Sequence, residues 1–324
     1  MLTNDQENSL INAENVLSGL MEKNFVTSRS NFLRFQDMSI GLPILIPADP
    51  TLFEFKNSET FRIDDVELLD TFYGKRDESY TGFQHSFYTN YYLSSIKIRP
   101  EIIGAYTKHS KDNYRSAQAI RELKAKHNVL AAFQTRNIPH VGHEAIIRAL
   151  LEYSDHVVIN PVIGPKKAGD LKLESLQKVY KYLAKTKYND KISFIPIRTM
   201  MFYAGPREAI HHAILRERLG FDLFTVGRDH AGADGFFDAA DAVKAIKKVQ
   251  HKIGIKIMHH EGAVFCSECD GGVLIGSCYH DRGQMVDVSG SEFRKQLVQN
   301  KIYRYADRDM QIYLRNQSIE SYEI

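Results

Sequence analysis

Residues 128–150 read NVLAAFQTRNIPHVGHEAIIRAL, and this stretch decides the fold. It begins with a short apolar run at 129–133, which predicts a buried strand. A polar loop follows at 134–139, and apolar side chains then recur at helical spacing up to residue 150. Pro139 suits a helix start, since a residue of the first turn needs no intrahelical N–H bond. We therefore predict a strand that leads into a helix N-terminus, where unpaired N–H groups and the positive end of the helix dipole favour a phosphate.

Apolar runs and helical patterns alternate along the chain beyond this stretch, which predicts an α/β fold. Such alternation is typical of parallel strands joined by right-handed crossovers, and we expect a doubly wound, Rossmann-like sheet. Ligands bind beyond the C-terminal ends of the strands in such sheets, so the loops after the strands are candidate sites. The predicted strands are 129–133, 156–159, 192–197, 223–226 and 255–258, and the predicted helices are 144–153, 173–186, 207–219 and 236–253.

The predicted helix start carries an H-x-G-H pattern at residues 140–143. His140 and His143 are one turn apart, so both rings can face the same bound group. Gly142 removes a Cβ at a point where a nucleotide could lie close to the backbone. Two surface or core histidines on a helix are the alternative interpretation of this pattern alone.

The longer segment QTRNIPHVGHE resembles the QTRNPxHxxHE signature of the ATP sulfurylase family, which belongs to the H-x-G-H nucleotidyltransferase superfamily. MFYAGPREAIHHAILRERLG from Met201 and GRDHAG from Gly227 resemble further motifs of this family, in the same order. One position departs from the signature, because Ile138 stands where the family has proline. The resemblance implies a sulfate adenylyltransferase that uses ATP with magnesium. It also implies a sheet of the nucleotidyltransferase type and a homodimer.

The implied reaction joins sulfate to the α-phosphorus of ATP and releases diphosphate. Sulfate is already a dianion, so catalysis needs positioning and charge compensation rather than a general base. Arg136 suits sulfate because its planar fork binds two oxygens at once, and Arg228 is expected to be a second clamp. His140 and His143 are expected to donate to phosphate oxygens, and Thr135 and Asn137 are expected to add neutral donors.

The resemblance also assigns contacts residue by residue. The residues implied to contact ATP are Gln134, Thr135, Arg136, Asn137, Gly227, Arg228, Asp229 and His230, and those implied to contact sulfate are Gln134, Arg136 and the backbone N–H of Ala231. Two functions of other classes stay open: a superfamily enzyme with a different acceptor, and a non-catalytic homologue that binds or regulates.

Several other polar residues have two interpretations. Arg207 and Glu208 suit helix capping as well as anion contact, and the lysine pair at 166–167 is more typical of a solvated loop than of a phosphate site. We expect the histidine pair at 211–212 to pack in the core and Asp229 to hold its own loop. The polar group at 259–261 is compatible with a metal site or with an ordinary strand end.

The segment VSGSEFR at 288–294 resembles a second motif of the family, ISGTELR. By itself it is a helix-capping pattern, with Ser289 or Ser291 as the cap. Its position downstream of the H-x-G-H pattern favours a loop on the triphosphate side of the site.

Cysteines occur only within residues 266–278, in the pattern Cys266-x2-Cys269-x8-Cys278-x-His280. Three thiolates and an imidazole suit tetrahedral zinc, so we predict a structural zinc site within 262–282. Free buried thiols or a reactive pair are the alternatives.

The chain has 324 residues, which is enough for two domains. Its formal net charge of +2 argues against a general nucleic-acid or membrane-surface binder. The start of the chain lacks a basic segment followed by an apolar core, so we expect a cytoplasmic protein. Short strand-like segments at 32–35, 42–46, 52–55, 66–72 and 91–98, after an early helix, predict a small mixed-β domain. The expected domains are a shortened PUA-like domain at 1–120 with a linker at 110–115 before a helix at 115–126, a catalytic domain at 121–288, and a helical region at 289–324.

Overall fold

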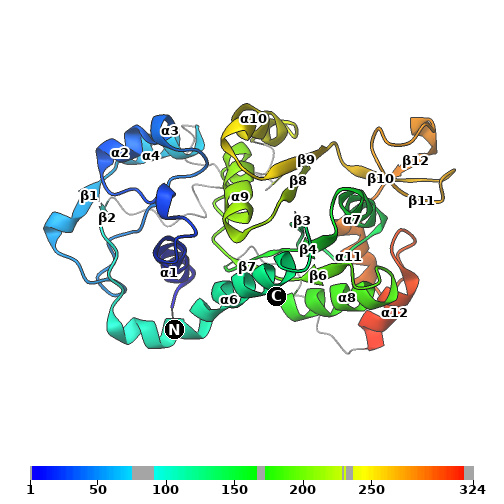
Figure 1. The fold of residues 1–324 in the computed structure, drawn as a ribbon, viewed down its shortest axis with the longest axis horizontal. Helices are drawn as coiled ribbons and strands as arrows, with labels where there is room; N and C mark the ends of the chain where they lie inside the picture. The colour runs from blue at the N-terminus through cyan, green and yellow to red at the C-terminus, as the bar shows by residue number, and fades with distance from the viewer. Residues whose placement is uncertain (1, 75–90, 166–171, 228–229, 231–235, 317–324) are drawn as a thin grey trace.

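A computed structural model describes residues 2–74, 91–165, 172–227, 230 and 236–316 (Figure 1). Its centre is a five-stranded sheet whose strands all run parallel, in the order β6-β4-β3-β8-β9. Numbered along the chain this is the 3-2-1-4-5 order of a doubly wound sheet, which reverses direction between β3 and β8. All five predicted strands are therefore confirmed. They are β3 (Leu130–Phe133), β4 (His156–Ile159), β6 (Ile192–Phe194), β8 (Leu223–Gly227) and β9 (Lys256–His260).

The helices that connect these strands also match the predictions. The helix predicted at 173–186 has these bounds in the structure, and the one predicted at 236–253 begins later, at residue 241. A parallel pair of two-residue strands, β5 (Val162–Ile163) and β7 (Ile197–Arg198), lies beyond β4 and β6. The helices are α6 (Pro100–Lys124), α7 (Val141–Tyr153), α8 (Leu173–Thr186), α9 (Pro206–Leu219) and α10 (Asp241–Val249), the last followed by the 3-10 turn η4 (Gln250–Lys252).

Side chains alternate between the two faces of the sheet, and each face has its own core. Ala131 and Phe133 of β3 pack in a cluster with α7, α8 and the C-terminal helices. Leu130 and Ala132 pack in a second cluster with α6, α9, α10 and the N-terminal segments. Since both faces are covered there, the central strands β3 and β8 consist almost wholly of apolar residues, as expected for a parallel sheet, whereas the edge strand β9 is mainly polar.

The chain before α6 has more helix than strand among the described residues. A capping box formed by Thr3 and Gln6 starts α1, which confirms the predicted early helix. The only strand pair described in this part is β1 with β2, which are antiparallel. The elements are α1 (Asn4–Leu17), η1 (Glu22–Asn24), α2 (Arg29–Leu33), α3 (Phe35–Met38), η2 (Asn57–Glu59), β1 (Thr60–Arg62), α4 (Asp65–Leu68), the π-helix η3 (Leu69–Tyr73) and β2 (Tyr91–Leu93).

Two of the strands predicted in this part are wrong, because local caps start helices there. Ser28 accepts a hydrogen bond from the backbone N–H of Asn31 and starts α2, so Phe32 and Leu33 are helical, and Phe35 begins α3. Asp64 and Glu67 form a capping box before α4, so 66–72 are helical too. Residues 42–46 and 52–55 form isolated bridges rather than strands, and β2 covers only the start of 91–98. The PUA-like domain stays a prediction.

The linker predicted at 110–115 is also wrong, because α6 runs through it without a break. Two polar side chains in and just after this segment, Asn113 and Ser116, are buried. The Asn113 side chain donates to the carbonyl oxygen of Arg198 at 2.7 Å, and the Ser116 hydroxyl donates to that of Pro196 at 2.6 Å. A polar, glycine-free sequence was therefore a helix with buried hydrogen bonds.

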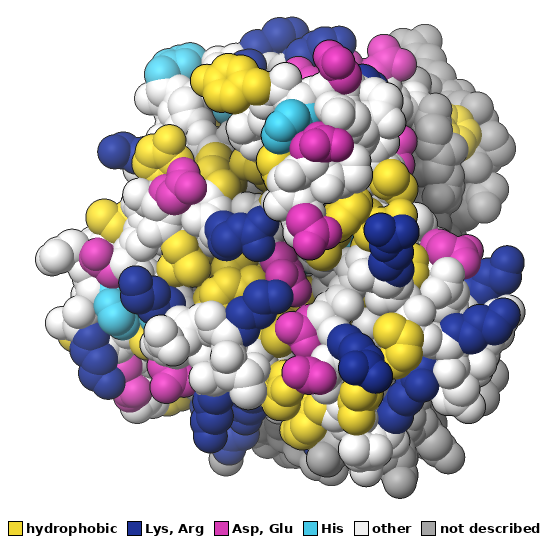
Figure 2. Space-filling model, turned by 90° about the vertical axis from the view of Figure 1, so that its right-hand side faces the viewer, with side chains coloured by type: hydrophobic (Ala, Val, Ile, Leu, Met, Phe, Trp, Pro, Cys, Tyr) yellow, Lys and Arg dark blue, Asp and Glu magenta, His cyan; other side chains and the backbone are white. Residues whose placement is uncertain are grey.

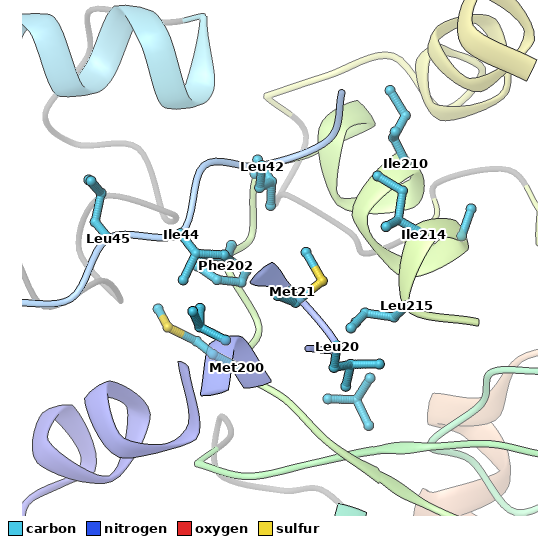
Figure 3. Close-up of a cluster of buried hydrophobic side chains, with 14 of the residues drawn as sticks. Leu20, Met21, Leu42, Ile44, Leu45, Met200, Phe202, Ile210, Ile214 and Leu215 are labelled. Atoms are coloured by element: carbon cyan, nitrogen blue, oxygen red, sulfur yellow. The ribbon is translucent and has the colours of Figure 1, made fainter. Parts of the chain in front are cut away.

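The N-terminal segments and α9 share one apolar core. Figure 3 shows Leu20, Met21, Leu42 and Ile44 facing side chains of the 200–202 segment and α9. Each of these four side chains is at least nine-tenths buried. The α9 side chains drawn there are Ile210, Ile214 and Leu215.

The C-terminal part places a small antiparallel sheet against α7, and its two helices join the core that α7 and α8 share. The sheet has the order β11-β10-β12, from β10 (Ala263–Cys266), β11 (Gly271–Leu274) and β12 (Met285–Asp287), with η5 (Arg282–Gln284) before β12. Two helices follow, α11 (Gly290–Val298) and α12 (Arg308–Asn316), and the division of the chain into domains stays a prediction. Figure 2 shows the face on this side of the molecule, where basic and acidic side chains are interspersed. Among the described residues, no helix is long and apolar enough to cross a membrane.

Candidate functional site

The loop after β3 leads into α7 through a histidine cap. His140 is the N-cap of α7, and its Nδ1 accepts a hydrogen bond from the backbone N–H of Gly142 at 3.2 Å. Pro139 therefore lies before the cap and outside the helix, whereas we predicted it in the first turn. The backbone N–H of Val141 donates to the carbonyl oxygen of Tyr305 at 2.9 Å. The prediction of unpaired N–H groups at this helix start is thus wrong for these two residues, because an imidazole and a carbonyl occupy them.

The two histidines of the pattern lie together, as predicted. Their ring centroids are 4.0 Å apart, and Nδ1 of His143 lies 3.4 Å from the backbone N–H of His140, which donates to it. Burial lowers the pKa of His140 to about 4, and burial also holds the pKa of His143 well below its ordinary value. Both rings are therefore neutral near pH 7. Because each Nδ1 accepts a hydrogen bond, the ring proton is on Nε2, which is left as the donor to a ligand.

Gly142 has a different role from the predicted one. A Cβ at this position would lie 3.0 Å from Cε1 of His140 and 3.1 Å from Cγ2 of Val288. The missing side chain therefore makes room for the histidine ring, and for Val288 from the second motif.

The second motif contacts the QTRN loop directly. Ser289 is the N-cap of α11, since its hydroxyl accepts from the backbone N–H of Glu292 at 3.3 Å. Arg294 donates from Nη1 to Oδ1 of Asn137 at 3.3 Å, and from Nη2 to the hydroxyl of Ser291 at 3.2 Å. The start of α11 and the loop after β3 are therefore one site, as their order in the sequence indicated.

The rest of the QTRN loop lies at the C-terminal end of β3. Arg136 is exposed, whereas Thr135 is buried and its hydroxyl accepts from the backbone N–H of Asn137 at 3.2 Å. The side-chain oxygen Oε1 of Gln134 is buried without a hydrogen-bond partner. A buried acceptor of this kind is typical of a site that a ligand or water completes.

The loop after β8 meets the same region through histidines. Gly227 ends β8, and a Cβ there would lie 2.6 Å from Cε1 of His260 at the end of β9. Burial is the main cause that lowers the pKa of His143 and of His230, and the nearby His260 lowers both further. The site between β3 and β8 therefore gathers histidines from three strand ends. Arg228, Asp229 and Ala231 lie outside the described residues, as do Lys166 and Lys167.

A buried chain of polar groups reaches His230 from α9. Nδ1 of His212 is 3.1 Å from Nε2 of His230, and Nε2 of His212 is 3.3 Å from a carboxylate oxygen of Glu208. Glu208 also accepts hydrogen bonds from the backbone N–H groups of Phe202 and Ala204. The predicted packing role of His211 and His212 is confirmed by their complete burial.

The neighbours of this chain are structural as well. Arg207 donates to the carbonyl oxygens of Thr71 and Phe72, so its guanidinium ties α9 to the N-terminal part. Arg216 is fully buried and donates to the carbonyl oxygen of Asn160, directly after β4, at 3.0 Å. Both contacts explain these arginines without an anion.

The three cysteines and His280 form the expected cluster beyond β10. Their ligand atoms all lie within 4.8 Å of one another. The sulfur atoms of Cys269 and Cys278 are 3.4 Å apart, and Nδ1 of His280 is 3.1 Å from the sulfur of Cys278. A tetrahedral zinc site with Zn–S of about 2.3 Å requires ligand separations of about 3.5–3.8 Å, so the residues fit the ion. Among the described residues, the group at 259–261 forms no such cluster.

Comparison with known proteins agrees with this arrangement. The ATP-sulfurylase family matches residues 109–303. A sulfate adenylyltransferase of Thermococcus onnurineus is 30% identical over 286 residues, which cover 87% of this chain and 72% of the relative. The chain belongs to the ATP-sulfurylase family.

Other relatives of the ATP-sulfurylase family align over shorter segments. The sulfate adenylyltransferase of Ignicoccus hospitalis is 39% identical over 173 residues, or 53% of this chain and 45% of the relative. That of Pyrococcus abyssi is 34% identical over 229 residues, or 70% of this chain and 60% of the relative. The chain thus spans about half of the length of several relatives that it matches.

A solved structure shares the fold. The structure titled "Hexameric APS kinase from Thiobacillus denitrificans" superposes with a TM-score of 0.59 at 14% identity, covering 96% of this chain and 62% of that chain. At this identity the likeness shows the fold alone.

Sequence reasoning missed two residues of the site. Arg294 is in the second motif, and its position one turn after the helix cap was a signal that it reaches the loop after β3. For His260, the sequence pattern indicates only a possible metal ligand or an ordinary strand end. Its signal was its place at the C-terminal end of a predicted strand, which is the same edge as the QTRN loop.

Proposed function

We propose that this protein is a sulfate adenylyltransferase that converts ATP and sulfate into adenosine 5′-phosphosulfate and diphosphate. The observation that carries the proposal is the convergence of three motifs beyond the C-terminal end of β3. The QTRN loop, the histidine-capped start of α7 and the start of α11 contact one another there. Membership of the ATP-sulfurylase family supports it.

In the proposed reaction, a sulfate oxygen attacks the α-phosphorus of ATP, and the bond from this phosphorus to the bridging oxygen of the diphosphate breaks. Sulfate brings its own negative charge, so no proton has to be removed. The protein has to hold two anions together and to stabilise the charge that develops on the leaving diphosphate. Magnesium would come with ATP and would be held mainly by the phosphates.

The neutral histidines suit the leaving-group side. His140 and His143 each keep a proton on Nε2, which can donate to a phosphate oxygen. Burial strengthens such a hydrogen bond because little water screens it. Since the rings are uncharged before ATP binds, they do not hold the diphosphate as cations would, and the product can leave.

The sulfate side is assigned to Arg136 and Gln134. Arg136 is exposed at the C-terminal end of β3, where an incoming anion reaches its guanidinium. Gln134 adds a side-chain amide with a buried oxygen that lacks a partner. Arg228 and the backbone of Ala231 complete the proposed sulfate site by family resemblance.

The deciding test is sulfate-dependent exchange between ATP and labelled diphosphate. We expect exchange with the wild type and a loss of at least about 10²-fold for Arg136→Ala, because a charge-assisted bidentate contact is removed. Arg62→Ala is the matched control, because Arg62 is exposed on β1 in the N-terminal part. Wild-type protein without exchange would mean a non-catalytic homologue.

We also propose that Cys266, Cys269, Cys278 and His280 hold one structural zinc ion. The donor set and its separations support it. Four protein ligands would leave no open position, so the ion would stabilise the fold and take no part in the reaction. Metal analysis should give one zinc per chain, and zinc-free native protein would refute the proposal. By family resemblance, we propose a cytoplasmic homodimer.

A further inference from the structure

The small sheet that carries the cysteine cluster packs on the first turn of α7. Gly272 of β11 lies so close to Val141 that a Cβ on Gly272 would be 2.0 Å from the Val141 carbonyl oxygen and 2.5 Å from its carbonyl carbon. Val141 directly follows His140, the cap of the helix. The backbone of β11 therefore touches the residue next to the candidate phosphate donor.

Two further contacts fix this approach. Arg148, two turns along α7, donates from Nη2 to the carbonyl oxygen of Gly272 at 2.6 Å. On the other side, the Val141 N–H donates to Tyr305, and the Tyr305 ring lies 5.0 Å from the Phe265 ring of β10. The first turn of α7 is thus held between the hairpin β10–β11 and the segment around Tyr305.

The hairpin has little apolar core of its own. Among residues 263–287, all of which are described, only Val264, Phe265, Cys266 and Gly272 are buried. Such a small unit needs a further constraint to keep one shape. Cys266 ends β10 and Cys269 lies in the turn before β11, so the metal ligands flank the strand that carries Gly272.

We propose that the hairpin β10–β11 is a positioning element for His140, with Gly272 as the contact that sets the place of the first turn of α7. Fixed by its four ligands, the hairpin is a rigid support that keeps the Nε2 of His140 at the leaving diphosphate. This inference rests on the proposed function, because it assumes that His140 contacts ATP. It assigns Gly272 and Arg148 as positioning residues that contact no substrate.

A pair of neighbouring glycines provides the test. Gly272→Ala needs a displacement of at least about 1 Å at Val141, since a Cβ is essentially never found closer than 3.0 Å to another atom. Gly271→Ala is the matched control in the same strand, because its Cβ would meet only the Cys269 carbonyl oxygen at an ordinary 3.7 Å. Zinc content and the KM values for ATP and sulfate are measured for both.

We expect Gly271→Ala to match the wild type. We expect Gly272→Ala to keep its zinc and its KM for sulfate, with a KM for ATP raised about tenfold or more, because misplacement by about 1 Å costs up to about 10²-fold. A merely structural role would lower the amount of active protein and leave both KM values unchanged. Equal KM values for ATP in the two variants, or loss of zinc with an unchanged KM, would overturn the inference.

Two other measurements cover the remaining outcomes. If Gly272→Ala does not fold, Arg148→Gln removes the hydrogen bond without adding atoms, and an unchanged KM for ATP then counts against the proposal. If the wild type shows no exchange activity, the proposed function fails. Amide hydrogen exchange of residues 141–146 then decides the coupling, with faster exchange expected after zinc is removed with a chelator, and unchanged exchange overturning it.

Discussion

His140 has two separable tasks, and a pair of substitutions tells them apart. As the N-cap of α7, its Nδ1 accepts the Gly142 N–H. As the proposed phosphate donor, it uses Nε2. Asparagine is among the best capping residues, but its side chain ends short of the position of Nε2. Alanine provides neither a cap nor a donor.

The structure sets the expected magnitudes. Loss of a cap costs about 1 kcal/mol, so His140→Ala should be less stable than His140→Asn by about that amount. Both variants lose a hydrogen bond to a charged oxygen, worth about 1.5–3 kcal/mol, which corresponds to about 10- to 10²-fold in kcat/KM for ATP. Both also lose the ring contact with His143, so this contact cancels between them.

Urea unfolding measures the stability difference, and sulfate-dependent exchange measures kcat/KM for ATP. We expect the two variants to differ in stability and to have equally low activity. Wild-type activity in His140→Asn would remove the ring from the proposed chemistry. Equal free energies of unfolding for the two variants would refute the capping role.

Three further predictions follow from single contacts. Gly142→Ala should lower activity several-fold, because its methyl group would lie 3.0 Å from the His140 ring and displace it. Urea unfolding should show no loss of stability, since alanine favours a helix over glycine by up to about 1 kcal/mol. Unchanged activity would contradict this steric role. The free energy of unfolding should fall as the pH drops from about 6.5 to about 4, because the unfolded chain takes up protons that the folded chain does not. Each buried histidine, such as His140 with its pKa of about 4, should contribute up to about 1.4 kcal/mol per pH unit. Urea midpoints that do not change over this range would refute the prediction. Lys187→Met should destabilise the protein by about 2 kcal/mol in urea unfolding, because the buried Glu144 carboxylate loses the ammonium group that lies 2.6 Å away. Lys244→Met, at an exposed ion pair, should change stability by less than about 1 kcal/mol. Equal effects of the two variants would count against a buried pair.

The parallel sheet could be predicted because its strands carry their own signal. Buried on both faces, they are continuous apolar runs such as 130–133, and polar loops separate them from amphipathic helices. The N-terminal part gave no such contrast. Short apolar runs there occur in helices too, and the caps at Ser28 and Asp64 decided the outcome.

The sequence predicted which motifs would lie near the candidate site, whereas the roles of their residues stay predictions. The spacing of the cysteines and the order of the motifs already indicated two separate centres. Orientation could not be predicted, because it depends on tertiary contacts. That His140 turns its Nδ1 back onto its own helix, and that Arg294 reaches Asn137, follow from how α7 and α11 pack. The same holds for the contact between Gly272 and Val141.

The apolar core that joins the N-terminal segments to α9 has a practical consequence for work on fragments of this protein. The family model matches residues 109–303, and a fragment with these bounds would expose apolar side chains of α9 to water. They include Ile210, Ile214 and Leu215. Bare hydrophobic area of this kind promotes self-association, so such a fragment should precipitate or recruit chaperones. Work on the isolated chemistry of this protein therefore has to keep its first hundred residues attached.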